Sequence, residues 1–252
     1  MLKLYIGNKN YSSWSMRPWV LLKQVGIPFE EIKLRFDSFD ANSTFKEKIG
    51  GVNPTGRVPA LDDDGFVVWD TLAIAEYAAE RFPDKKLWPQ DVKARARARS
   101  VCAEMHSGFG ALRSACPMNI EADLSEVGQL IWRDKPAVRA DVQRLVDMWT
   151  ELLAQYKGHR TAGPPQGASA PSGGRETEST VGANFLFGEF SIADAFFAPV
   201  CMRLSRYGLP VPAQISAYIQ RVSALPGVKA WIDDALAEND FREFEEPYRI
   251  KR

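Results

Sequence analysis

The fold of this chain is decided by one stretch, Asn53-Pro54-Thr55-Gly56-Arg57-Val58-Pro59-Ala60-Leu61, and by the segment Trp69-Asp70-Thr71-Leu72-Ala73-Ile74-Ala75-Glu76-Tyr77 that follows it. Pro59 stands where a strand should begin, and it has no N–H to donate to a strand ladder. An X–Pro bond at the mouth of a sheet is also a favoured place for a cis peptide. Such a bond turns neighbouring N–H and C=O groups outward. We therefore expect a site at Val58 and Pro59 whose backbone pairs with a peptide-like ligand.

The residues after Pro59 read as a hairpin followed by a helix. Two β-like runs, 58–61 and 66–69, are joined through Asp63-Asp64-Gly65, which is a strong hairpin signal. Asp70 and Thr71 offer caps for the next helix, and Pro83 ends it. This order places a capped helix start beside the proposed backbone site.

Upstream of this stretch, the sequence alternates between strand and helix patterns. Apolar residues at every second position predict strands over 2–6 and 32–36. A helix is expected over about 15–25, because Gly26 ends the apolar period there. The polar segment 40–49 indicates a short helix and loops. One crossover pair and one hairpin together predict a small mixed sheet with helices packed on it.

Beyond Pro89 the strand signals nearly disappear. Helices are expected at 93–112, 136–156, 191–207, 212–224 and 228–238. The sequence therefore predicts two domains, an α/β domain over 1–83 and an all-helical domain over 90–252. A Gly- and Pro-rich segment near 158–183 cannot bury enough apolar surface to offset its ordering entropy, so we expect a mobile surface insertion there.

The composition excludes several classes of protein. The 32 basic and 32 acidic side chains cancel, so the basic excess of a nucleic-acid-binding protein is missing. No apolar run approaches the roughly 20 residues that span a bilayer, and the N-terminus lacks the apolar core of a signal peptide. Three scattered cysteines and two histidines suit neither a disulfide framework nor a metal site. We expect a cytoplasmic protein without a metal.

The first place that could carry chemistry is the segment 11–18, where Ser12, Ser13 and Ser15 stand at the start of a helix. Orphan N–H groups and the positive end of the helix dipole favour an anion at such a position. A serine hydroxyl donating to a bound thiolate would stabilise it further. The alternative is that these serines only cap the helix, which is a common role of serine.

The second place is the opening stretch itself. Val58 could pair its backbone with an extended ligand, as in strand addition. Asp70 and Thr71 could bind an ammonium and a carboxylate group respectively, although both also suit simple capping. Together, the two places bring an anion-favouring helix end, a docking edge and an acid–hydroxyl pair into one small domain.

The motifs at 12–17, 58–61 and 70–74 resemble those of the glutathione transferase superfamily. The serine segment is most similar to the serine-using, zeta-like branch, except that Trp14 stands where zeta members carry cysteine. Residues 187–195 resemble the capping-box segment that begins a central buried helix in this family. The resemblance covers nearly the whole chain, apart from the Gly- and Pro-rich segment.

The resemblance implies a thioredoxin-like N-terminal domain that binds glutathione and an all-α C-terminal domain that lines an acceptor pocket. Ser12 matches the hydroxyl that activates the glutathione sulfur, and Ser13 adjoins it. Val58 matches the residue before the cis-proline, here Pro59, whose backbone pairs with the cysteinyl part of glutathione. The Asp70–Thr71 pair matches the acid and hydroxyl, usually Glu and Ser, that hold the γ-glutamyl end.

By this resemblance the chain is expected to be a homodimeric, cytosolic glutathione transferase whose partners are glutathione and a small electrophile. Met105, His106 and Phe109 are candidates for an apolar acceptor pocket, and they suit an ordinary core equally well. Two alternatives stay open. One is a glutathione-dependent cis–trans isomerase of the maleylacetoacetate type, and the other is a non-catalytic interaction protein with the same fold.

Overall fold

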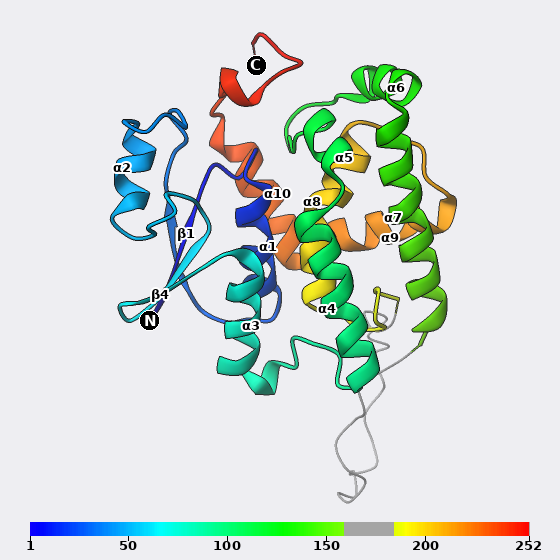
Figure 1. The fold of residues 1–252 in the computed structure, drawn as a ribbon, viewed down its shortest axis with the longest axis horizontal. Coiled ribbons are helices and arrows are strands. Elements are labelled where there is room, and N and C mark those ends of the chain that lie inside the picture. Colours follow the sequence, from blue (N-terminus) through cyan, green and yellow to red (C-terminus); the bar gives the residue numbers. More distant parts are fainter. Residues whose placement is uncertain (159–183, 252) are drawn as a thin grey trace, which may run out of the picture.

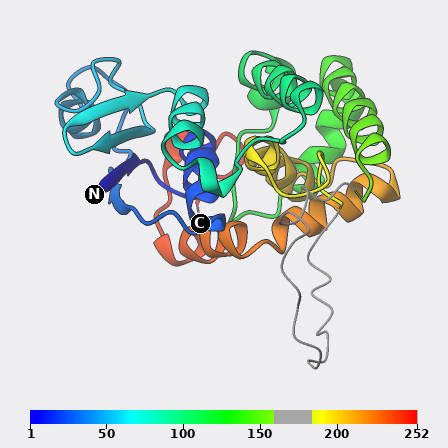
Figure 2. The same ribbon diagram turned by 90° about the horizontal axis from the view of Figure 1, so that it is seen from below.

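The computed structural model describes residues 1–158 and 184–251, and Figure 1 shows its course. The insertion predicted near 158–183 therefore lies, apart from Gly158, outside the described residues. Figure 2 gives a second view, in which the sheet lies at one end of the molecule and helices make up the rest.

The N-terminal part contains a four-stranded sheet of order β2-β1-β3-β4. Its strands are β1 (Leu2–Ile6), β2 (Glu30–Lys33), β3 (Ala60–Asp63) and β4 (Phe66–Trp69). β1 pairs with β2 in parallel, whereas β3 runs antiparallel to both β1 and β4. Asp64 and Gly65 join β3 to β4 with positive φ angles of 50° and 95°, which a two-residue hairpin turn requires. The hairpin prediction is confirmed.

Helices cover both faces of this sheet. Their bounds are α1 (Ser13–Gln24), α2 (Thr44–Gly50) and α3 (Thr71–Arg81). Successive side chains of β1 point to opposite faces of the sheet. Leu4 belongs to the core shared with α1 and α3, whereas Tyr5 packs on the smaller cluster around α2. In Figure 1, α2 lies on one side of the sheet and α1 and α3 on the other. This is the thioredoxin-like arrangement that the sequence predicts.

The elements after Arg81 are helical, and α8 forms their centre. Their bounds are α4 (Val92–Ser107), α5 (Gly110–Ala115), α6 (Ser125–Asp134), α7 (Pro136–Gln155), α8 (Ile192–Arg206), α9 (Ala213–Ser223) and α10 (Pro226–Glu238), with 3-10 turns at Pro83–Lys85 and Glu243–Glu245. Residues 192–204 are all buried, and α8 packs against α1, α4 and α9. Ser191 and Asp194 form the predicted capping box at its start.

Three elements differ from the sequence-based expectation. The helix expected over 93–112 is interrupted, because Gly108 ends α4 with an extended backbone and Phe109 adopts φ 56° before α5. The second strand ends at Lys33, and beyond it the Phe36 N–H donates to the Asn8 side chain at 2.8 Å. The third difference is α6, a helix that is absent from the sequence-based expectation.

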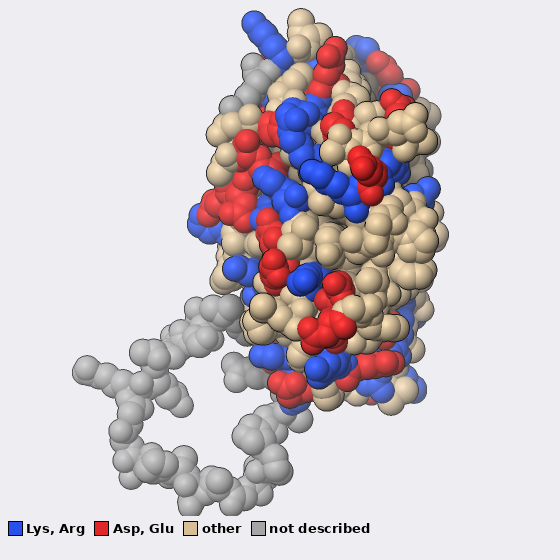
Figure 3. Space-filling model, turned by 90° about the vertical axis from the view of Figure 1, so that its left-hand side faces the viewer, with Lys and Arg blue, Asp and Glu red and all other residues tan. Residues whose placement is uncertain are grey.

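Charges are mixed on the face that the N-terminal part presents in Figure 3. Lys and Arg side chains alternate there with Asp and Glu, so no broad field of one sign forms on this face. Among the helices within 1–158 and 184–251, none combines the length and apolarity needed to cross a bilayer.

Candidate functional site

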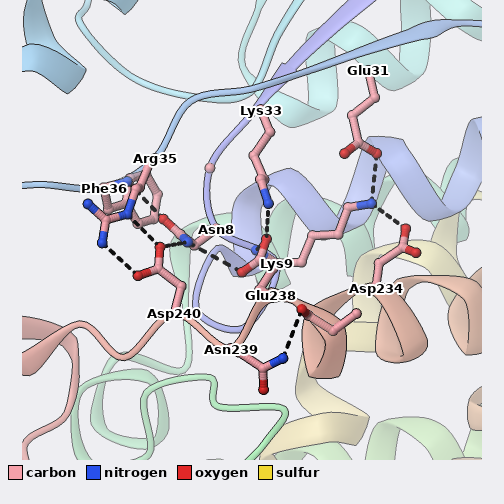
Figure 4. A network of polar contacts seen from close by, with 12 residues as sticks. Asn8, Lys9, Glu31, Lys33, Arg35, Phe36, Asp234, Glu238, Asn239 and Asp240 are labelled. Carbon is pink, nitrogen blue, oxygen red and sulfur yellow. Dashed lines mark hydrogen bonds and ion pairs between the residues drawn. The ribbon is translucent and has the colours of Figure 1, made fainter.

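The loop before α1 is fixed by polar contacts to the C-terminal part of the chain, as Figure 4 shows. The Asn8 amide accepts from the Phe36 N–H and donates to the Asp240 carboxylate at 3.0 Å. The backbone N–H of Lys9 donates to the Glu238 carboxylate at 2.9 Å. These bonds set the position at which α1 begins, and hence where its serines lie.

The side chain of Lys9 is buried and fully paired. Its ammonium lies 2.7 Å from the Glu31 carboxylate and 2.5 Å from that of Asp234. It also lies 4.4 Å from the centre of the Trp19 ring and 5.5 Å from that of Trp231. Carboxylates and indole faces together compensate the burial of this charge.

The serines at the start of α1 differ in what their hydroxyls do. Ser12 is the N-cap, 7% exposed, and its hydroxyl donates to the Ser15 hydroxyl at 2.7 Å. The Ser15 hydroxyl in turn accepts from the Gly7 N–H. Ser13 is half-buried, and its oxygen accepts from the Arg203 guanidinium at 3.2 Å. The proton of Ser13 has no acceptor among the described residues, so it is free to be donated to a ligand.

Two hollows adjoin at the α1 start, with volumes of about 530 Å³ and 490 Å³. Both are lined by four shared residues, Trp14, Arg57, Val58 and Arg113. The Val58–Pro59 peptide is cis, as predicted. Within the described part of the chain, the backbone N–H and C=O of Val58 make no hydrogen bond. A residue whose own N–H and C=O are both unpaired thus lines both hollows.

The first hollow ends at the start of α3, where the acid and hydroxyl predicted from the sequence come together. One oxygen of Asp70 accepts from the Leu72 N–H at 2.8 Å, and the other lies 3.2 Å from Nε2 of His106. The hydroxyl of Thr71 is buried and has no hydrogen-bond partner in the parts of the chain described. A buried hydroxyl without a partner is costly in a closed core, but beside a hollow it can bind a ligand.

The second hollow is lined by aromatic and cationic side chains. Phe36, Phe39 and Phe45 stack edge to face along one side. The Lys46 ammonium donates to the Gly56 carbonyl at 2.7 Å. The lining also includes Pro117 and Met118 from the loop after α5, Arg203 of α8 and Glu245 of the C-terminal segment. Burial, together with the neighbouring Glu246, raises the pKa of Glu245 to about 7.

Two arginines, Arg17 and Arg113, lie against Trp14, and a third, Arg203, lies near them at Ser13. None of the three has an acidic ion-pair partner among the described residues. The guanidinium of Arg17 lies 4.1 Å from the Trp14 ring and that of Arg113 lies 4.9 Å from it. Burial, with the nearby charges of Arg203 and Arg113, lowers the pKa of Arg17 to about 9. Burial and Arg113 lower the pKa of Arg203 to about 10. Three arginine side chains without an acidic partner therefore lie near the start of α1.

The three residues predicted for the acceptor pocket do not line one common hollow. His106 lines the first hollow. Met105 and Phe109 are buried in the main core and line neither hollow. Their role at a substrate stays a prediction.

Sequence reasoning missed Arg113, Arg203 and Glu245. A signal for Arg203 was present, because it is a single arginine within the apolar run of α8. The residues described contain no group of three or more His, Cys, Asp or Glu side chains that could hold a metal ion.

Comparison with known proteins gives matches along most of the chain. The model of the glutathione S-transferase N-terminal domain matches residues 11–81, and that of the C-terminal domain matches residues 94–234. A maleylacetoacetate isomerase of Rattus norvegicus is 31% identical over 132 residues, which cover 52% of this chain and 58% of that protein. The glutathione S-transferase theta-3 of Mus musculus is 34% identical over 99 residues, covering 39% of each chain. The chain thus spans about half the length of the curated relatives it matches.

A solved structure extends the likeness of fold. The crystal structure of a Burkholderia glutathione transferase homolog with bound glutathione superposes with a TM-score of 0.61. It covers 93% of this chain and 97% of its own, at 24% sequence identity. At this identity the superposition shows a shared fold.

Proposed function

Because this chain belongs to the glutathione S-transferase family, we propose that it binds glutathione, converts the thiol to thiolate and joins the sulfur to a small electrophile. One observation carries the proposal. The unpaired backbone of Val58 stands between a hollow that ends at Asp70 and Thr71 and a hollow that ends at Ser12 and Ser13. A tripeptide with a thiol at its centre fits this order of groups.

In the proposed complex, each charged group at the ends of glutathione lies beside a protein group that attracts its charge. Asp70 binds the ammonium of the γ-glutamyl end, and the Thr71 hydroxyl with the N–H groups of α3 binds its carboxylate. The N–H and C=O of Val58 pair with the cysteinyl residue, as in strand addition. The cations Lys46 and Arg57, which line the second hollow, bind the glycine carboxylate.

Thiol activation is the chemical task at the α1 start. A free thiol with pKa about 8.5 is only about 3% thiolate at pH 7. Lowering this pKa to about 6.5 makes roughly three quarters thiolate and requires about 2.7 kcal/mol. A charge-assisted hydrogen bond and a helix N-terminus can supply this. The thiolate then attacks the electrophilic carbon, a C–S bond forms, and the leaving group departs with its electron pair.

The orientation of the hydroxyls favours Ser13 over Ser12 as the donor to the thiolate. Ser12 already donates to Ser15, whereas Ser13 only accepts, from Arg203. We expect Ser13→Ala to lower kcat/KM for 1-chloro-2,4-dinitrobenzene about 100-fold with little change in glutathione affinity, because it removes stabilisation of the thiolate and not of the tripeptide. Ser12→Ala, the matched control, should cost less. Equal turnover in all three proteins would reject a serine as the activating group.

A second candidate function is glutathione-dependent cis–trans isomerisation, favoured by relatives that are named maleylacetoacetate isomerases. The same thiolate would add to a double bond and be expelled after rotation. Product analysis separates the two reactions, because an isomerase consumes no glutathione. A non-catalytic interaction protein is the third possibility. Calorimetry tests it, since no heat of binding at millimolar glutathione would favour that reading over both enzymes.

We also propose that the chain forms a homodimer in the cytoplasm. Phe66 and Trp69 on the edge strand β4 and Val92 at the start of α4 are exposed, and they supply apolar surface for a second copy. The cysteines Cys102, Cys116 and Cys201 are free and buried, which suits a reducing compartment. Light scattering after size exclusion should give twice the 28.2 kDa chain mass.

A further inference from the structure

The second hollow carries more positive charge than glutathione requires. Its lining includes Lys46, Arg57, Arg113 and Arg203, against one carboxyl group, that of Glu245. Lys46 and Arg57 lie on the side of the thioredoxin-like part, where the proposed glycine carboxylate of glutathione would be bound. Arg113 and Arg203 come from α5 and α8, on the side where a second substrate would enter.

The contacts of these two arginines leave their charge uncompensated. Arg113 donates to the carbonyls of His106 and Gly108, both at 3.3 Å. Arg203 donates to the Cys116 carbonyl at 2.9 Å, to the Ser13 hydroxyl at 3.2 Å and to the Pro199 carbonyl at 3.5 Å. All these acceptors are neutral. They satisfy N–H groups and fix the guanidinium planes, but they do not neutralise the charges, which are costly to bury alone.

The surroundings hold this charge in place. Arg203 is 5% exposed, and Arg113 lies against the ring of Trp14. Arg17 adds a third cation behind that ring, and no ion pair links it to an acid within 1–158 or 184–251. Arg113 uses only Nη1 in its hydrogen bonds, and each Nη of Arg203 carries a second N–H besides the one already donated. Such N–H groups at the edge of a partly desolvated hollow can bind a planar oxyanion.

We infer that the second substrate carries a carboxylate, which Arg113 and Arg203 hold beside Ser13 so that its electrophilic carbon faces the glutathione sulfur. This inference rests on the proposed glutathione site, and it holds for conjugation and isomerisation alike. The apolar neighbours Pro117 and Met118 would contact the rest of such a molecule. The acceptor is thus an amphipathic acid rather than a wholly apolar electrophile.

The test compares two electrophiles that differ only in charge, 4-chloro-3,5-dinitrobenzoate and its amide. In both, sulfur bonds to the ring carbon that carries chlorine, and chloride leaves. After division by the uncatalysed rates, we expect the wild type to prefer the carboxylate by at least about tenfold in kcat/KM. Arg113→Gln should reduce the preference to below about threefold, and Arg113→Lys should retain part of it, because a point charge lacks the planar fork.

A control variant and a second readout make the result specific. Arg144→Gln on α7 removes an exposed arginine that pairs with Glu104, and it should keep the full preference. If the arginines serve only the thiolate, Arg113→Gln will slow both electrophiles equally and raise the pKa of bound glutathione, measured by thiolate absorbance. Equal losses, or no preference in the wild type, would overturn the inference.

Direct binding separates this inference from the proposed function. Unreactive 3,5-dinitrobenzoate should bind the wild type without glutathione and bind Arg113→Gln about tenfold more weakly in calorimetry, whereas 3,5-dinitrobenzamide should bind both equally. If glutathione fails to bind while the benzoate binds, the glutathione proposal fails and the anion site stands. If Arg113→Gln does not fold, equal binding of benzoate and benzamide by the wild type would still contradict the inference.

Discussion

Lys9, in the loop before α1, and Arg17, within α1, are both buried cations, but their surroundings differ. Lys9 lies between the carboxylates of Glu31 and Asp234. Arg17 has no ion pair with an acid in the described chain and rests against the rings of Trp14 and Phe196. The first charge is neutralised inside the protein, whereas the second belongs to a group of three guanidinium ions that repel one another.

This difference separates a structural role from a functional one. A paired charge such as Lys9 fixes the loop that begins α1 and leaves little field outside its own contacts. An unpaired group destabilises the fold and keeps a positive field at the place where a thiolate and an acidic substrate are proposed to meet. Proteins commonly retain such local instability at sites where it supports function.

The largest expected effect comes from making Lys9 resemble Arg17. The double substitution Glu31→Gln and Asp234→Asn leaves the buried ammonium with neutral amide oxygens and indole faces, and without a compensating negative charge. We expect the free energy of unfolding in urea to fall by about 3 kcal/mol, as when one side of a buried ion pair is removed.

The control for this prediction is an ion pair at the surface. Asp233→Asn removes the exposed partner of Lys229 and should change stability by less than about 0.5 kcal/mol. If the double variant lost no more than about 0.5 kcal/mol of unfolding free energy, Lys9 would not depend on its carboxylate partners. The contrast drawn with Arg17 would then be wrong.

A smaller effect is expected at Thr71, whose buried hydroxyl has no hydrogen-bond partner within 1–158 and 184–251. Thr71→Val replaces a hydroxyl with a methyl group of similar size. We expect glutathione to bind about tenfold more weakly, since one ligand hydrogen bond is lost, while unfolding stability does not fall because no internal bond is broken. Thr71→Ser should preserve the affinity. Calorimetry that finds the same Kd for the valine variant would remove Thr71 from the site.

The smallest effect is expected on making Arg17 neutral. Arg17→Met removes the desolvation cost but also the cation–ring contacts, so the free energy of unfolding at pH 7 should rise by about 1 kcal/mol. A loss of 2 kcal/mol or more would instead place Arg17 with Lys9 as a structural charge.

The pH dependence of this effect has a definite sign. Because the folded-state pKa of Arg17 is about 9, below its usual 12.5, the unfolded chain binds the proton more tightly. The penalty is therefore complete below pH 9 and diminishes as pH rises above it. The advantage of the methionine variant should be smaller at pH 10 than at pH 8, as measured by urea unfolding at both values.

Local patterns were sufficient to predict most of the fold. The Asp64–Gly65 turn, the cap at Asp70 and the break at Pro83 each follow from the conformational preferences of those residues. The cis peptide before Pro59 could be expected for the same reason. The break at Phe109 could not, because tertiary packing holds this residue in a left-handed conformation that phenylalanine itself disfavours.

The site was predictable only where its residues are neighbours in sequence. Ser12 with Ser13 and Asp70 with Thr71 are adjacent pairs at helix starts, so local capping rules single them out. Arg203 meets Ser13 across 190 positions, and only packing of α8 on α1 brings them together. The periodicity of a single sequence does not predict such a contact between distant residues. It also cannot show that Ser12 donates to Ser15 and leaves Ser13 free.

The contact between Asn8 and Asp240 has a consequence for the timing of synthesis. The two residues are 232 positions apart. At about 5–20 residues per second, the ribosome adds Asp240 roughly 12–46 s after Asn8. Over that interval a nascent chain can fold its sheet and the α3 start, but the loop before α1 still lacks its anchor. The residues of the proposed glutathione site at Val58, Asp70 and Thr71 are therefore synthesised long before the anchor that fixes the loop preceding the serines.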